Sequence, residues 1–395
     1  SKNAINSGNV KKGDVFEAST IAAIQAVKET PRIIPHCHPI PLEGTEVSWH
    51  WDNTSLWCTV SVTAHYKTGI EMEALTGVAA GLLCAFDMVA RRTQRRCSTM
   101  KAGWSFSKYC FTGITLMYLS VSVRIVEATC KTKLNVPAEE FIEIVKQGGA
   151  SAICMRASGA GVEASPEQLQ TLASKIASAN LPVTMVTADY DVPLNNAEGP
   201  SSLRNIRPSL DVAEAFDCDL IRVCMKNETD IAFVRQAAEL AAERGIRLAH
   251  QCHTSSLFEE VDQILDVLKE IDRDNFGIIY EPANLLLNGQ DYGVETLQRL
   301  APHIMNVYVQ NHRLDPKGPE VLDTYCRGPV RFHHLYLWET GGVDFTQVFQ
   351  GLRDIEYVGS FTIHQAQGIE TLEAATEYVK KCRRFFRNQT GACQR

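Results

Sequence analysis

The residues that first suggest chemistry in this sequence are His36, Cys37 and His38, in the segment IIPHCHP (33–39). Imidazole nitrogen and thiolate sulfur are good zinc ligands, so the cluster suggests a metal site, a catalytic pocket or packing. Adjacent residues on an extended segment point to opposite sides, whereas a tetrahedral site needs four ligands that converge. The three residues alone therefore do not make a zinc site, and their role depends on the fold around them.

The composition is that of a globular protein with an acidic balance. The chain has 395 residues, of which 45% are hydrophobic, a formal net charge of -7 and a pI near 5.9. This balance provides no basic surface for nucleic acid, and we interpret the basic run RRTQRR (91–96) as a solvated helix end. The expected partner is a small-molecule substrate, and assembly as a homo-oligomer is left open.

The cysteines and the apolar runs bear on the compartment. Thirteen cysteines are scattered without a CxxC pair, and we interpret them as reduced thiols of an intracellular, cytoplasmic protein. The polar segment SKNAINSGNVKKGD (1–14) indicates neither a signal peptide nor an anchor. The run YCFTGITLMYLSVSV (109–123) is shorter than the roughly 20 residues of a membrane helix, and its β-forming residues favour a buried strand.

The first hundred residues mix helical and strand periods, which indicates a compact α+β unit. A helix is expected over 17–30, ending before Pro31, because proline lacks the amide hydrogen and disfavours helix in the preceding residue. The alternating segments 46–51 and 56–66 flank the turn-like DNTS, which predicts a hairpin. A second helix is expected over 71–92, with an apolar stripe made of Leu75, Val78, Leu82, Phe86 and Val89.

From about residue 117 onward, strand-like and helix-like segments alternate. The candidate strands are YLSVSVRIV, ASAICMR, LPVTMVT, DLIRVCM, IRLAHQC, FGIIYEP, MNVYVQN and SFTIHQA. Eight strands alternating with helices match an α/β fold of the TIM-barrel, or (β/α)8, type, whose usual size is roughly 250 residues. An open doubly wound sheet is the alternative on periodicity alone.

The segment RCSTMKAGWSFSKYCFTGIT (96–115) fits neither pattern. It is the natural place for a junction between two units. The expected organisation is therefore an α+β unit over 1–96, a junction over 97–116 and a barrel over 117–395.

Three stretches of the first unit resemble the cyclic pyranopterin monophosphate synthase family of molybdenum-cofactor biosynthesis, often called MoaC. They are KKGDVFEASTIAAIQAVKET, IIPHCHPIPLEGTEV and KTGIEMEALTGVAAGLLCAFDM. The resemblance implies a small ferredoxin-like α+β domain and a lyase that converts a cyclic dihydro-GTP intermediate with release of pyrophosphate. It also implies that pocket positions are held by Lys12, His38, Glu71, Glu73 and Asp87. According to this resemblance, His38 belongs to the wall of the substrate pocket, and the side chain of the neighbouring Cys37 packs against other residues of the unit.

The first unit also departs from that family. Ala90 stands where the family has a catalytic lysine three residues after Asp87, and a methyl group cannot transfer a proton. Glu73 and Asp87 are fourteen residues apart and should face the same side of their helix. The family's leading strand is absent, and SVRIVEA (122–128), which could be its closing strand, is needed as the first strand of the barrel. We interpret the first unit as a truncated fragment.

Residues 117–387 resemble the sugar phosphate isomerase/epimerase group with the xylose-isomerase-like barrel. The resemblance rests on ICMRASGAGV, DLIRVCMKNETDI, GIRLAHQCHTSSLFE, NFGIIYEPANLLLNGQDYG, NVYVQNHRLDP and GGVDFTQVFQGLRDIEYVGSFTIHQA. In barrels of this kind the active site lies at the carboxyl ends of the strands. Those ends carry a ring of polar residues: Arg156, Asp189, Lys226, Gln251, His253, Glu281, Asn284, Gln310, His312, His364 and Gln365.

Many relatives hold a divalent cation there and move a proton beside a carbonyl through an enediolate. In this chain Gln251 and His364 stand where glutamates are common, and Glu281 stands where an aspartate is common. The implied metal ligands are Glu281, His312, His364 and Gln251, a set that favours manganese, zinc or iron over magnesium. A metal-free site with Glu281 as base is the alternative. The candidate catalytic residues are Glu281, His253, His312, Lys226 and Arg156.

Three functions follow from these readings. The leading one is a sugar or sugar-phosphate isomerase or epimerase carried by the barrel. The second is the MoaC-type lyase carried by the first unit. The third is a non-catalytic barrel that binds carbohydrate.

Overall fold

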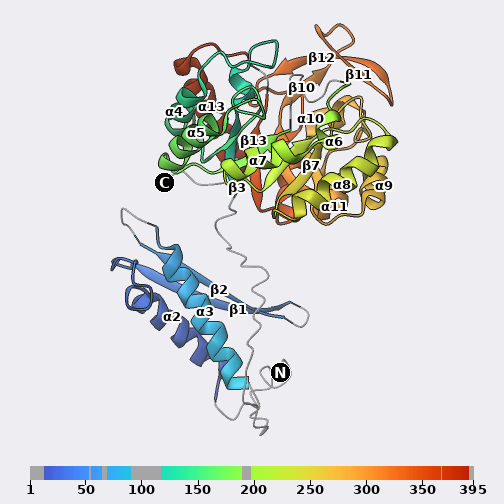
Figure 1. The fold of residues 1–395 in the computed structure, drawn as a ribbon. Coiled ribbons are helices and arrows are strands. Elements are labelled where there is room, and N and C mark those ends of the chain that lie inside the picture. The colour runs from blue at the N-terminus through green and yellow to red at the C-terminus, as the bar shows by residue number, and fades with distance from the viewer. Residues whose placement is uncertain are drawn as a thin grey trace. The chain divides into compact units, whose positions relative to one another are not determined.

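The computed structural model describes residues 13–52, 55–64, 69–89, 117–188, 197–365 and 367–390. The chain divides into two compact units, Ser1–Ile114 and Thr115–Arg395 (Figure 1). The predicted junction lies outside the described residues. Within those residues, we find no helix whose length and hydropathy would let it cross a bilayer.

The first unit consists of two helices and one hairpin. The elements are α2 (Val15–Ile33), β1 (Gly44–Asp52), β2 (Ser55–Thr63) and α3 (Glu71–Val89). Asp14 caps α2, because its carboxylate accepts hydrogen bonds from the backbone amides of Phe16 at 2.8 Å and Glu17 at 3.0 Å. The strands pair antiparallel from Gly44 opposite Thr63 to Asp52 opposite Ser55, so the predicted hairpin is confirmed.

The predicted end of the first helix is wrong. Pro31 lies inside α2, which continues to Ile33. A proline in the last turn removes only one backbone donor, and the amide of Ile34 closes the helix on the carbonyl of Thr30 at 2.8 Å. The helix therefore passes the proline before it ends.

The predicted apolar stripe of α3 is not its packing face. The buried residues of α3 are Glu73, Gly77, Gly81 and Ala85, which repeat every four residues, whereas Phe86 is 60% exposed. A Cβ atom at Gly77 would lie 2.6 Å from the side chain of Val27 in α2, so the glycine permits a close approach of the two helices. The small residues thus face α2, and several larger apolar side chains face outward.

The second unit is a closed barrel, which confirms the predicted TIM-barrel fold and excludes the open sheet. All eight strands run parallel, in the order β13-β3-β4-β5-β6-β7-β8-β9. Their bounds are β3 Met117–Ser122, β4 Ala152–Cys154, β5 Val183–Thr187, β6 Leu220–Val223, β7 Arg247–Gln251, β8 Phe276–Tyr280, β9 Ile304–Val309 and β13 Gly359–Ile363. Each of the eight candidate strands of the sequence overlaps one of these strands.

Helices surround the barrel (Figure 1). They are α4 Ala138–Gly148, α5 Pro166–Ser178, α6 Ser201–Arg204, α7 Arg207–Ala215, α8 Ile231–Ala242, α9 Val261–Ile271, α10 Pro282–Leu287, α11 Val294–Leu300, α12 Phe345–Asp354 and α13 Leu372–Thr390. Short 3-10 helices are η1 Val123–Val126, η2 Glu228–Asp230 and η3 Ala301–His303. The helices pack buried apolar side chains against the outer face of the strands, as the continuous core of the unit shows.

The first barrel strand is shorter than predicted. It pairs with β13 and β4, which places it in the barrel, but it ends at Ser122 rather than at residue 126. The hydroxyl of Ser122 accepts a hydrogen bond from the amide of Arg124 at 3.3 Å and starts the 3-10 helix η1. This turn brings Arg124 and Glu127 to the carboxyl end of the barrel.

A small antiparallel sheet, which the sequence did not reveal, follows β9. Its strands are β10 Asn311–Leu314, β11 Glu320–Thr324 and β12 Gly328–Leu335, in the order β10-β12-β11. We call these three strands the outer sheet. Because β10 begins two residues after the end of β9, the outer sheet stands at the carboxyl end of the barrel (Figure 1).

Candidate active site

The interior of the barrel has an apolar layer with polar residues directly above it. One inward residue from each of six strands forms the apolar layer: Cys154, Met185, Leu220, Ala249, Ile279 and Tyr308. Side chains of a strand alternate, so the residue two positions later also points inward, one step nearer the carboxyl end. These next residues are Arg156, Thr187, Arg222, Gln251, Glu281 and Gln310, and all of them are buried.

Glu281 is the centre of the polar layer. Its Oε2 accepts hydrogen bonds from the amide nitrogens of Gln251 and Asn284, the latter at 2.8 Å. Its Oε1 accepts a hydrogen bond from the amide nitrogen of Gln310. Gln251, Glu281 and Gln310 lie at the carboxyl ends of the adjacent strands β7, β8 and β9, so barrel pairing brings together three residues that the sequence had placed at strand ends.

The environment of Glu281 raises the pKa of its carboxyl group. Burial raises the pKa of the carboxyl group from its ordinary 4.5 to about 7, although the hydrogen bond from Gln310 and the charges of Arg222 and Arg124 act in the opposite direction. A carboxyl group with a pKa near 7 is both base and acid at neutral pH. Glu281 is therefore the residue of this layer best suited to move a proton.

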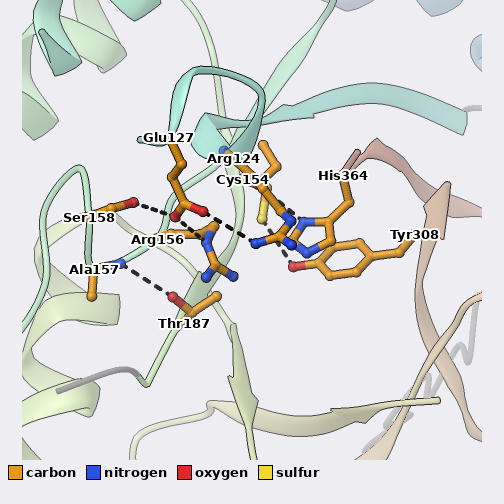
Figure 2. A network of polar contacts seen from close by, with 10 residues as sticks. Arg124, Glu127, Cys154, Arg156, Ala157, Ser158, Thr187, Tyr308 and His364 are labelled. Atoms are coloured by element: carbon orange, nitrogen blue, oxygen red, sulfur yellow. Dashed lines mark hydrogen bonds and ion pairs between the residues drawn. The ribbon is translucent and has the colours of Figure 1, made fainter. Parts of the chain in front are cut away.

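A second carboxylate, Glu127, holds two guanidinium groups beside the polar layer (Figure 2). Its Oε1 lies 2.6 Å from Arg156 Nε and 2.6 Å from Ser158 Oγ, and its Oε2 lies 3.3 Å from Arg124 Nη1. Burial alone would raise the pKa of Glu127, but the charges of Arg156 and Arg124 outweigh it and lower the pKa below its ordinary value. Glu127 is therefore ionised and fixes both arginines.

Sequence reasoning missed Arg124, Glu127 and Arg222 as site residues. Arg124 and Glu127 had been placed on the extension of a buried strand, where charged residues are rare. Arg222 is fully buried on β6, with its guanidinium carbon 5.7 Å from the ring centre of Tyr308. A charged residue within an otherwise apolar strand was the available signal in both cases.

His364 is part of the barrel interior. Its ring stacks on Tyr308 with centroids 3.7 Å apart (Figure 2). Its Nδ1 lies 3.3 Å from Ser122 Oγ. Tyr308 in turn contacts the thiol of Cys154 at 3.5 Å. Burial, with the charges of Arg124 and other cations, lowers the pKa of His364 well below its ordinary value, so the imidazole is neutral.

A cavity of about 820 Å³ opens above this interior. Its wall contains the predicted residues Lys226, His253 and His312, together with Asn284 and Gln310. The remaining predicted residues, which are Arg156, Gln251, Glu281, His364 and Gln365, are buried and do not line it. Asp189 lies outside the described residues. The structure thus divides the predicted ring into a cavity wall and a buried floor.

The outer sheet forms one side of the cavity. His312 on β10 packs against Phe332 at 4.6 Å and His334 at 4.8 Å between ring centroids, both on β12. His312 is 2% exposed, and neither of its ring nitrogens has a hydrogen-bond partner among the described residues. Burial, followed by the charges of His334 and Arg124, lowers the pKa of His312 well below its ordinary value. The ring is therefore a neutral group that can receive a polar ligand.

Glu259 attaches the outer sheet to the barrel. This buried carboxylate accepts hydrogen bonds from the backbone amides of Tyr325 and Cys326, each at 2.8 Å, in the turn between β11 and β12. It also accepts one from the amide of Ser255, in the loop that supplies His253 to the cavity. One side chain therefore connects two cavity walls.

Replacing Glu259 by glutamine is expected to loosen the outer sheet. The neutral amide has only one acceptor oxygen, so it cannot accept hydrogen bonds from all three backbone amides. We therefore expect a loss of about 2–3 kcal/mol in the free energy of unfolding. Cys326, an exposed free thiol, should react faster with iodoacetamide, as followed by peptide mass spectrometry. Exposed Cys130 serves as the internal control and Glu260→Gln as the control variant. Equal labelling of Cys326 in all variants would contradict the anchoring role.

Comparison with known proteins places this site in a family. Residues 142–387, more than half of the chain, match the family model described as xylose isomerase-like TIM barrel. The chain belongs to the xylose isomerase-like TIM barrel family. The structure of a xylose isomerase domain protein from Planctomyces limnophilus is similar, with a TM-score of 0.53 and 17% identity over 70% of this chain and 99% of that one.

Two further solved structures share this fold. A D-psicose 3-epimerase, solved in the presence of D-fructose, has a TM-score of 0.51 and 12% identity over 70% of this chain and all of that one. The IOLI protein, solved with a zinc atom, has a TM-score of 0.53 and 12% identity over 70% of this chain and 99% of that one. At these identities, the likeness establishes the fold alone.

The described residues of this xylose isomerase-like barrel do not fit a resident divalent cation. Both oxygens of Glu281 already accept hydrogen bonds from amide nitrogens, and Gln251 presents its nitrogen rather than its oxygen to that carboxylate. His364 is stacked on Tyr308, whereas His312 lies on the outer sheet. Across the described ranges, no three or more His, Cys, Asp or Glu residues are grouped so that they could hold a metal. The single carboxylate of the layer is held by hydrogen-bond donors.

The first unit matches a second family model, MoaC, over residues 1–101. A probable cyclic pyranopterin monophosphate synthase from Thermococcus kodakarensis is 52% identical over 85 residues, which are 22% of this chain and 54% of that protein. The chain thus spans about half the length of the curated relatives it matches. The lyase activity remains a prediction.

The residues that the MoaC resemblance implies are not gathered at one point. His38 lies in an irregular exposed segment, Glu71 and Asp87 are exposed on α3, and Glu73 is buried. Lys12 lies outside the described residues, as does Ala90. Glu73 and Asp87 face similar directions, but fourteen residues of helix separate them by about 21 Å along the axis. A shared helix face is therefore not a shared pocket within this unit.

Proposed function

We propose that the barrel is an isomerase or epimerase that moves a proton at a carbon next to a carbonyl group of a small polyhydroxylated substrate, without a resident metal. The observation that carries this proposal is Glu281, a buried carboxylate at the carboxyl end of β8 with a pKa raised to about 7. The similarity in fold to a D-psicose 3-epimerase supports the reaction class. The cavity above Glu281, about 820 Å³, has room for a substrate of sugar size.

In the proposed reaction, ionised Glu281 takes the proton from the carbon next to the carbonyl. The electron pair of the broken C–H bond moves toward the carbonyl oxygen, which gives an enediolate. Delivery of a proton to the opposite face of the same carbon by a second donor of the cavity wall, for which Lys226 is available, gives an epimer, while Glu281 keeps the proton that it removed. Return of the removed proton to the neighbouring carbon, with transfer of the hydroxyl proton, gives an isomer. No electron acceptor is needed in either case.

The surrounding residues have separate tasks in this scheme. Lys226, whose Nζ donates a hydrogen bond to the carbonyl of Ser255 at 2.9 Å, supplies positive charge for the developing oxyanion. His253 and His312 line the cavity and are neutral, since burial lowers the pKa of both well below the ordinary value. Arg156 is held on Glu127 below the cavity and acts as a positioning residue.

Access to Glu281 requires one local movement. Asn284 and Gln310 line the cavity and donate hydrogen bonds to Glu281, which is itself fully buried. One of these amides must turn aside so that the substrate carbon can reach the carboxylate. Active-site hydrogen bonds often rearrange in this way when substrate binds.

The proposal is tested by exchange of substrate hydrogen with solvent. The protein is treated with a chelator and incubated in D2O with ketoses, ketose phosphates and keto sugar acids, and NMR follows deuterium at the carbon next to the carbonyl. We expect incorporation without added metal. Exchange only after addition of a divalent cation would contradict the metal-free scheme, and tight sugar binding without any exchange would favour a binding protein.

A further inference from the structure

Ser255, in the loop after β7, connects separate parts of the cavity wall. Its amide donates a hydrogen bond to the carboxylate of Glu259, and its hydroxyl donates one to the carbonyl of Asp323 on β11 at 2.7 Å. Its carbonyl accepts a hydrogen bond from Lys226 Nζ at 2.9 Å. Ser255, Asp323 and Lys226 all line the cavity. One residue of the β7 loop is thus bonded to both the outer sheet and the lysine.

The backbone of Ser255 has a conformation that serine rarely adopts. Its φ angle is +52°, in the left-handed region. Six non-glycine residues of the described ranges have a positive φ, and four of them lie at or just after the end of a barrel helix, where this conformation is usual: Asn180, Asp217, Asp272 and Glu356. The other two, Lys131 and Ser255, line the cavity. No helix end accounts for the conformation of Ser255, so its contacts at the cavity wall hold it in place.

The side chain of Ser255 explains why a serine stands at this strained position. Glycine adopts positive φ angles without strain, but it has no hydroxyl group that could bond the carbonyl of Asp323. The serine therefore keeps a bond to β11 at the expense of an unfavourable backbone conformation. The same conformation sets the direction of the Ser255 carbonyl, which is the acceptor of the Lys226 ammonium group.

Lys226 is held at both its backbone and its tip. Its amide donates a hydrogen bond to the buried carboxylate of Asp230 at 2.8 Å, and Arg204 lies 3.2 Å from the other oxygen of that carboxylate. At the tip, the bond to Ser255 restricts a side chain that otherwise has many rotamers. An ammonium group has three N–H donors, so this bond leaves two that a substrate can use.

The place in which Lys226 is held changes its acidity. Burial lowers the pKa of the ammonium group below its ordinary 10.5, and the charge of Arg222 acts in the same direction. The charges of Cys224, Glu259 and Asp230 act in the opposite direction. A lysine with a lowered pKa gives up a proton more readily near neutral pH. Any change that lets the side chain leave this place for water should therefore raise its pKa.

We infer that Ser255 is a positioning residue for Lys226 and makes the orientation of the lysine depend on the outer sheet. The inference rests on the proposed function, in which Lys226 stabilises the oxyanion and can donate a proton. The Ser255 hydroxyl fixes the β7 loop against β11, and the carbonyl of the same residue holds Nζ at the cavity wall. Lys226 is thus in its working position only while the outer sheet closes the side of the cavity.

The test follows acetylation of Lys226 by trace acetic anhydride in the full chain across neutral and alkaline pH, read by peptide mass spectrometry. Ser255→Gly accepts the left-handed conformation and removes the hydroxyl group, so the chain should fold. We expect the midpoint of the Lys226 profile to rise toward the ordinary lysine value, while exposed Lys269 is unchanged. Asp272→Gly, the same kind of replacement at the end of α9, is the control and should leave the Lys226 profile as it is.

Proton exchange of the ketose that reacts fastest supplies the second measurement. We expect kcat to fall at least about tenfold in Ser255→Gly with a smaller change in KM, because the lysine is no longer held in place. An unmoved Lys226 midpoint, or an equal shift in Asp272→Gly, would overturn the inference. A moved midpoint with unchanged kcat would also refute it, since Ser255 would then orient the lysine without effect on the reaction. A moved midpoint in a protein that exchanges no substrate would refute the proposed function and support the placement of Lys226 by Ser255.

Discussion

Replacing Glu281 by glutamine is expected to lower the rate of proton exchange by roughly 10²- to 10⁴-fold, the usual contribution of a general base. The amide that replaces the carboxylate cannot take a proton from carbon. The measurement is deuterium incorporation by NMR for the unchanged protein and the variant on the same substrate. Equal rates would show that another group is the base.

The same substitution should change how stability depends on pH. The folded-state pKa of Glu281, about 7, is above the ordinary value of 4.5, so the folded protein keeps this proton where the unfolded chain has released it. The contribution to stability is complete below pH 4.5 and is lost as the pH rises through 7, by up to about 3 kcal/mol. Urea unfolding from pH 5 to 8 should therefore show a flatter profile for Glu281→Gln. An unchanged profile would contradict the raised pKa.

Replacing Glu127 by glutamine is expected to destabilise the barrel by about 3–5 kcal/mol, because the buried guanidinium groups of Arg124 and Arg156 lose their shared carboxylate. The pKa of Glu127 is lowered in the folded protein, so its contribution is present above its ordinary pKa and is lost as the pH falls through the folded value. The difference between the two proteins should therefore be largest at neutral pH and shrink in acid. Urea unfolding measures both effects.

The control for Glu127 is a surface carboxylate. Glu139 Oε1 lies 3.6 Å from Lys175 Nζ, and both side chains are about half exposed. Glu139→Gln should cost less than about 1 kcal/mol, as is usual for exposed pairs. If Glu127→Gln loses no more free energy of unfolding than Glu139→Gln, other groups must balance the charges of Arg124 and Arg156.

The barrel followed from the sequence because its signal is repeated and local. Each strand is a short apolar run, each is followed by a helix, and eight such pairs leave few ways to bury the strands on both faces. Gln251, Glu281 and Gln310 could also be grouped in advance. Gln251 ends β7, whereas Glu281 and Gln310 directly follow β8 and β9. Consecutive parallel strands of a barrel are neighbours, so the hydrogen bonds of these residues follow from strand order.

The charges of the site could not be grouped in the same way. Arg124 and Glu127 reach the barrel mouth because β3 ends at Ser122 and turns into η1, a change of direction that depends on one side-chain hydrogen bond. The outer sheet is an insertion after β9, and contacts distant along the chain hold it on the barrel, among them those of Glu259 with Tyr325 and Cys326. Contacts of this kind have no periodic signature.

The sequence by itself therefore determined the number and order of the barrel strands, the MoaC-like character of the first unit and the polar residues at the strand ends. The tertiary structure decided which of those residues line the cavity, that Glu281 is held by three amides, and that small residues form the packing face of α3. The reason is physical. Periodicity reports which side of an element is apolar, whereas the pKa and the partners of a buried charge depend on groups that only the folded chain brings together.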